Sequence, residues 1–104
     1  MSAYSVTFLS AQINSRIGRS YHLSPIVLEI TEYQSGTKPV IDPTSQVKND
    51  AIVFFLPKIF GIYTYLPIWD KSTGEVTVWD LDGAEEATNG NNLSSFGGFV
   101  LGTN

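Results

Sequence analysis

The chain has 104 residues, a formal net charge of −4 and no cysteine. A chain of this length fits one domain, residues 1–104, which can bury somewhat more than about 60% of its extended surface on folding. Without cysteine it cannot form a disulfide, a thiolate metal site or a catalytic thiol, and its negative charge argues against binding to nucleic acid.

Charged residues are scarce in this chain. They make up 15% of it, while 42% of the residues are hydrophobic and 12% aromatic; an average soluble domain is about a quarter charged. Two interpretations remain open. Either the surface is neutral and rich in Ser, Thr, Asn and Gly, or much of the exterior is covered by other subunits, because interface cores are depleted in charge and enriched in aromatic residues. We favour the second interpretation.

The first part of the chain predicts two strands. Residues Tyr4 to Leu9 alternate between two faces, and residues 12–19 are expected to connect them to the next strand, with a turn at Gly18. The second strand runs from Tyr21 to Tyr33, and Pro25 is a point where it can bend. Apolar residues alternate with others along it, so one face of the sheet is expected to lie in the core.

The middle of the chain predicts two further strands. Residues 34–39 are expected to form a turn, and Val40 to Asp50 a longer excursion with no more than one helical turn. Strands follow over 51–57 and 62–69, separated by a turn at 58–61. β-branched and aromatic residues dominate both runs, and these side chains suit a pleated, half-buried surface better than a helix.

The same region, Ala51 to Trp69, is long enough to cross a bilayer as a helix. Two prolines, Pro57 and Pro67, and the charged Lys58 interrupt the run, and no basic cluster flanks it. We therefore expect two buried strands in place of a membrane span, and no membrane partner.

A hairpin is predicted at residues 70–74. Asp70 comes first in this loop and can accept hydrogen bonds from the turn backbone. Gly74 comes last and can take the positive φ that closes such loops.

The return strand, residues 75–79, places its two valines on one face and Trp79 on the other. Trp69 on the outgoing strand could meet Trp79 or its neighbours across the ladder, since aromatic pairs stabilise a sheet.

The chain then continues with a turn at 80–83, a short strand within 84–88, a loop at 89–92 and an apolar strand at 99–101 that follows two glycines. About seven short strands, with turns at spacings of roughly 8 to 12 residues, predict an all-β fold. We expect a single antiparallel β-sandwich or partly closed barrel with little or no helix.

No group of residues indicates a catalytic or metal site. His22 is the only histidine, and spacing places no nucleophile or acid beside it, so a satisfied strand histidine is favoured over a catalytic one. The run from Asp80 to Glu86 resembles a calcium loop but lacks the third ligand of that pattern, so a turn with solvated acids is expected. We predict no enzymatic activity, no cofactor and no bound metal.

Aromatic residues are the best candidates for a binding surface. Four of them, Tyr63, Tyr65, Trp69 and Trp79, could stack against a sugar ring. Aromatic residues in strands more often belong to a core or a subunit interface. The two arginines could form a positive spot, although two solvated loop charges are the ordinary outcome. We predict that the partner or subunit interface contains Phe60, Tyr63, Tyr65, Trp69, Trp79, Arg16 and Arg19.

Several segments have a family likeness: Ile17-Gly18-Arg19, the strand 28–33 running into Ser35-Gly36, the hairpin 70–78, Trp79-Asp80 leading into Asp82-Gly83, and the hydrophobic strand ending at Gly102. In size and in the rhythm of these segments, nearly the whole chain resembles the small, cysteine-free head decoration (cement) and related virion proteins of tailed bacteriophages.

This resemblance implies a non-enzymatic β domain that binds the outer surface of the major capsid protein lattice and stabilises the head. It also implies a homo-oligomer, with a trimer favoured over a dimer, located on the outer capsid surface of the virion. Synthesis in the host cytoplasm is expected, because Met1 to Val6 lacks the pattern of a signal peptide. The alternatives are a phage tail or fibre component and a carbohydrate-binding β-sandwich module.

Overall fold

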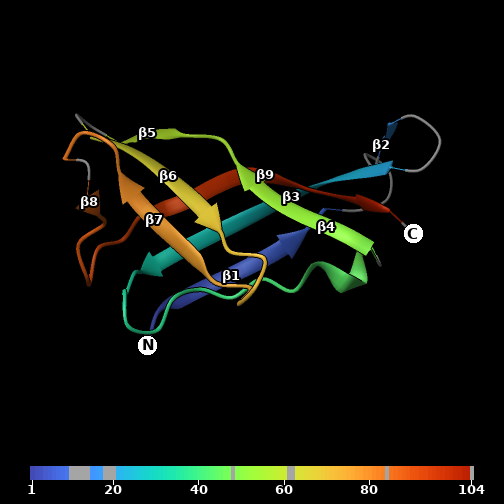
Figure 1. The fold of residues 1–104 in the computed structure, drawn as a ribbon. Helices are drawn as coiled ribbons and strands as arrows, with labels where there is room; N and C mark the ends of the chain where they lie inside the picture. Colours follow the sequence, from blue (N-terminus) through green and yellow to red (C-terminus); the bar gives the residue numbers. More distant parts are fainter. Residues whose placement is uncertain (10–14, 18–20, 48, 61–62, 84, 104) are drawn as a thin grey trace.

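The computed structural model describes residues 1–9, 15–17, 21–47, 49–60, 63–83 and 85–103. Within them the protein is all-β, and its strands form one curled antiparallel sheet with the shape of a half-barrel (Figure 1). The predicted class, a sandwich or partly closed barrel, is confirmed. These residues contain nine strands, more than the sequence predicts, because two short strands pair beside longer ones.

The strands are β1 (Ala3–Phe8), β2 (Ser15–Ile17), β3 (Tyr21–Glu32), β4 (Asn49–Phe55), β5 (Lys58–Phe60), β6 (Tyr63–Trp69), β7 (Val76–Asp80), β8 (Glu85–Glu86) and β9 (Ser94–Thr103). A short 3-10 helix, η2 (Pro43–Ser45), precedes β4.

The sheet order is β1-β3-β9-β4-β6-β7-β8, with β2 also beside β3 and β5 also beside β6. β9 lies between β3 and β4 and pairs with β3 from Tyr21↔Thr103 to Ile30↔Ser94. Among the described residues, β4 and β6 share the single pair Phe54↔Ile68. The sheet therefore folds over between β4 and β6, and its two halves enclose the core.

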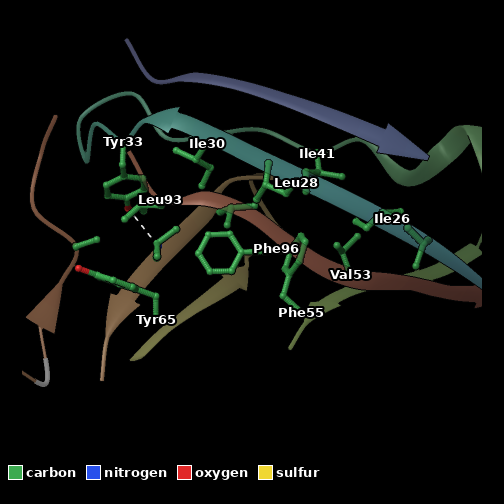
Figure 2. Close-up of a cluster of buried hydrophobic side chains, with 14 of the residues drawn as sticks. Ile26, Leu28, Ile30, Tyr33, Ile41, Val53, Phe55, Tyr65, Leu93 and Phe96 are labelled. Carbon is green, nitrogen blue, oxygen red and sulfur yellow. Dashed lines mark hydrogen bonds between the residues drawn. The ribbon is translucent and has the colours of Figure 1, made fainter. Parts of the chain in front are cut away.

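Alternation along the strands builds this core. Ile26, Leu28 and Ile30 of β3 come from one half of the sheet, Val76 and Val78 of β7 come from the other, and all five are at most 1% exposed. The same cluster includes Val100, and it includes Phe55, Tyr65 and Phe96, which are labelled in Figure 2. The buried set of β3 has the period of two that the sequence predicts.

The segment from Lys38 to Val47 covers the outer edge of β7. The Val76 N–H donates to the Pro39 carbonyl, and the Ile41 N–H donates to the Gly74 carbonyl, both over 2.8 Å. Ile41 and Val47 are buried in the core cluster. The predicted excursion is therefore a structural part of the domain, and its 3-10 helix η2 stays within the limit of one helical turn that the sequence sets.

Two segments that the sequence predicts as connections form strands in the structure. Residues 15–17 pair with β3 as β2, because β3 continues past the end of β1 and offers a free edge there. Residues 58–60, predicted as a turn, form β5, whose ladder continues to the pair Phe60↔Tyr63. Gly18 and Gly61, the predicted turn positions, lie outside the described residues. The last strand, β9, is also longer than predicted and runs through both glycines.

The hairpin between β6 and β7 has the predicted chemistry. Gly74 has a φ of 76°, and the Asp70 carboxylate accepts hydrogen bonds from the backbone N–H and hydroxyl of Ser72. Trp69 lies opposite Val76, whereas Trp79 lies opposite Leu66. The two tryptophans therefore project from opposite faces of the sheet and do not pair across the ladder.

Candidate interaction surface

The outer face of the sheet, opposite the core, carries exposed apolar side chains on β4. Val53 and Phe55 point into the core, so Ile52 and Phe54 point outward, and both are exposed. Leu56, directly after the strand, is exposed as well. Apolar residues thus occupy both faces of this strand.

Neighbouring strands continue this apolar surface. Leu101 and Phe99 of β9 lie opposite Ile52 and Phe54, and the rings of Phe54 and Phe99 are 5.6 Å apart between centroids. On its other side Phe54 lies opposite the exposed Ile68 of β6. The surface therefore crosses three adjacent strands without interruption.

The surface extends toward β7 and β5. Trp79 lies opposite Leu66 on the outer face of β7 and is exposed. Ile59 of β5 lies opposite Thr64, and the Leu81 N–H donates to the Thr64 carbonyl. We call this surface the outer apolar face; it consists of Ile52, Phe54, Leu56, Ile59, Leu66, Ile68, Trp79, Leu81, Phe99 and Leu101.

The outer apolar face is large for a domain of this size. Seven of its side chains are between 38% and 75% exposed. A large apolar side chain has on the order of 200 Å² of surface, so these seven expose roughly 700 Å². The largest apolar patch on a typical monomer is about 300–600 Å², and a standard interface covers about 800 Å² of each partner. The area therefore approaches that of a protein–protein interface.

The centre of this face carries no charge. The outward positions where β4, β6 and β9 adjoin hold Ile52, Phe54, Thr64, Leu66, Ile68, Gly97, Phe99 and Leu101. None of these described residues is ionisable. Interface cores have this composition, because an unpaired charge is costly to bury.

The predicted interface residues are dispersed in the structure. Trp79 lies on the outer apolar face. Tyr65 is 8% exposed and belongs to the core, and Tyr63 is exposed at the start of β6, where its ring lies 6.4 Å from that of Tyr65. Trp69 lies at the other end of β6, half-buried on the inner face. About 20 Å of strand separates Tyr63 from Trp69, so the four aromatic residues do not form one platform.

The other three predicted residues are placed only in part. Arg16 lies in β2 opposite His22, and Phe60 lies in β5 opposite Tyr63; the structure does not describe their side chains. Arg19 lies outside the described residues. Their contact with a partner stays a prediction.

The acidic run after β7 is a turn in which the carboxylates bind backbone. Asp80 accepts hydrogen bonds from the N–H groups of Asp82 and Gly83, and Asp82 accepts one from the Thr64 N–H. In the described part of the chain, no group of three His, Cys, Asp or Glu side chains is placed to hold a metal ion. None of the described helical segments has the length and hydropathy of a membrane-spanning helix.

Comparison with protein-family models, with curated proteins and with solved structures finds no match to this chain.

Proposed function

We propose that this protein is a non-enzymatic virion structural protein, a capsid decoration protein that binds the outer surface of the major capsid protein lattice and stabilises the head. The observation that carries the proposal is the uncharged centre of the outer apolar face, built on Ile52, Phe54 and Ile68. The resemblance of the sequence to head decoration proteins gives the class of partner.

The position of this face in the sheet suits such a role. β9, β4 and β6 each have neighbours on both edges, so their backbones are fixed before a partner arrives. A surface that is already ordered loses little conformational entropy on binding, and more of its buried apolar area contributes to affinity.

Binding to the assembled lattice would stabilise the head by mass action. A ligand that binds the closed shell and not its free subunits shifts the equilibrium toward the closed shell. We propose that the protein acts as a homo-oligomer, with a trimer favoured over a dimer, because several copies held together bind a symmetric lattice with higher avidity than one. Light scattering on the purified protein measures the oligomeric state.

The test uses capsid shells of the parent particle that lack this protein. We expect the purified protein to bind these shells and to raise the temperature at which they disrupt. In the double variant Ile52→Thr/Ile68→Thr, each substitution removes buried hydrocarbon from the interface, and we expect roughly 10- to 100-fold weaker binding.

The matched control is Val40→Thr. Val40 is 47% exposed, close to the 50% of Ile52 and 49% of Ile68, and it lies in the 38–47 segment, beyond the edge of β7 and outside the outer apolar face. All three substitutions keep a β-branched side chain, so the fold is expected to persist, and circular dichroism checks this. Failure of the wild-type protein to bind shells, or equal binding by the double variant and the control, would contradict the proposal.

A further inference from the structure

A second surface feature lies at the end of the domain away from Tyr63. It is an open cleft between the 40–44 segment and the hairpin residues 71–74, with a volume of about 500 Å³. Small-molecule sites commonly have volumes of about 300–1,000 Å³. Trp69 and Ala51 line this cleft between its two walls.

Hydrogen bonds fix Trp69 and both walls to one another. The indole Nε1–H of Trp69 donates to the Ile41 carbonyl over 3.1 Å, and the Ile41 N–H donates to the Gly74 carbonyl over 2.8 Å. The indole therefore has one orientation relative to the segment on one side and the hairpin on the other. A ligand would meet an aromatic surface that needs no rearrangement.

The rim of the cleft is polar and of mixed charge. Asp42 and Asp50 supply carboxylates, Lys71 supplies an ammonium group, and Thr44 and Ser72 supply hydroxyls. Asp42 already accepts a hydrogen bond from the Thr44 N–H over 3.0 Å, and hydrogen bonds from Thr44 lower the pKa of Asp42. Asp42 is therefore an ionised acceptor at neutral pH.

This mixture of groups favours a neutral ligand. The lining places the ammonium group of Lys71 beside the carboxylates of Asp42 and Asp50, so neither a cation nor an anion would meet charges of the opposite sign alone. A neutral polyol can use every group, because each hydroxyl both donates to a carboxylate and accepts from an ammonium group. Its apolar ring face can pack on the indole of Trp69.

We propose that the cleft around Trp69 binds a neutral saccharide, at the level of one or two pyranose rings. This activity is separate from capsid binding, because the cleft and the outer apolar face share no residue. It is tested on the isolated protein, so the outcome does not depend on whether the protein binds shells.

The experiment is an NMR titration of the ¹⁵N-labelled protein with glucose, galactose, mannose and N-acetylglucosamine, each as the free sugar and as a disaccharide. The two indole N–H signals provide an internal control. We expect at least one sugar to shift the Trp69 signal and amides of 40–44, 50–51 and 71–74 in a saturable way, with a dissociation constant of about 1 mM. The Trp79 signal is expected to stay in place.

Variants identify the polar contacts. Asp50 has a φ of 54°, and asparagine tolerates this conformation, so Asp50→Asn keeps the backbone and changes the hydrogen-bonding group. We expect Asp50→Asn to weaken sugar binding about tenfold. The control Glu29→Gln alters an exposed carboxylate on β3 and is expected to leave it unchanged.

Two results would overturn the proposal. One is the absence of a saturable shift at Trp69 with every sugar tested. The other is a shift produced by the cation probe n-butylammonium or the anion probe acetate but by none of the sugars, since the ligand class would then be wrong.

Discussion

Among single residues, Tyr33 links β7 and β8 through hydrogen bonds of its hydroxyl group. It is fully buried, its hydroxyl donates to the Glu86 carboxylate over 2.6 Å, and it accepts from the Val78 N–H over 3.3 Å. β8 has two residues, Glu85 and Glu86, and pairs only with the end of β7. The Tyr33 hydroxyl thus supplies an acceptor for a β7 amide that β8 does not reach.

The same burial predicts a loss of stability at high pH. Burial, together with the hydrogen bond to Glu86, raises the pKa of Tyr33 above its ordinary value of 10.0, and burial likewise raises the pKa of Tyr65. Above pH 10 the unfolded chain releases these protons while the folded protein keeps them. The free energy of unfolding is therefore at its full value below pH 10 and falls as the pH rises further.

Urea denaturation between pH 8 and pH 11 measures this effect. Each retained proton lowers the free energy of unfolding by about 1.4 kcal/mol per pH unit. Tyr33→Phe is expected to have a shallower pH dependence than the wild type, whereas the exposed control Tyr4→Phe is expected to keep the wild-type slope. A pH dependence unchanged by Tyr33→Phe would contradict this assignment.

Among the strands, β9 depends on a close approach to β4. A Cβ at Gly98 would overlap the Phe54 carbonyl and come within 2.5 Å of the Phe55 ring. A Cβ at the neighbouring Gly97 would have no heavy atom within 4 Å. The structure therefore leaves no room for a side chain at Gly98, whereas it has room for one at the adjacent Gly97.

We expect Gly98→Ala to lower the free energy of unfolding by about 1–3 kcal/mol, because either the strands separate or the Phe55 ring moves. Gly97→Ala is expected to be neutral or slightly stabilising, since it only restricts the unfolded chain. Denaturant unfolding of the two variants provides the comparison. Equal effects on stability would show that the close contact between β9 and β4 is absent.

The elements that the sequence predicts correctly are those whose signal is local. The alternation of Ile26, Leu28 and Ile30 defines β3, and Asp70 and Gly74 define the hairpin by their turn chemistry. The pairing of residues 58–60 as β5 depends on tertiary contacts, and so does the burial of the 38–47 segment. The loop-like composition of these two segments reveals neither the pairing nor the burial, because each segment is stabilised by the strand or the core against which it packs.

For the molecule as a whole, the low content of charged residues is most evident on one surface. The outward side chains where β4, β6 and β9 adjoin carry no charge, so this is the surface that we expect a partner to cover. The aromatic residues chosen from the sequence include only one residue of that surface, Trp79. For the proposed interface, the sequence signal lies in residues 51–56, because both faces of this strand are apolar and such a pattern is typical of strands that are buried on both faces.

Single-cysteine labelling measures directly whether capsid binding buries the outer apolar face. The chain has no native cysteine, so Ile68→Cys reports on the outer apolar face and Val40→Cys reports on the 38–47 segment, which is not part of that face. We measure the rate of maleimide labelling of each variant, free and bound to capsid shells. We expect binding to slow labelling of Ile68→Cys on the order of tenfold or more and to leave labelling of Val40→Cys unchanged, because water is excluded from the core of an interface. Bound protein in which Ile68→Cys reacts as fast as in the free state would contradict this expectation.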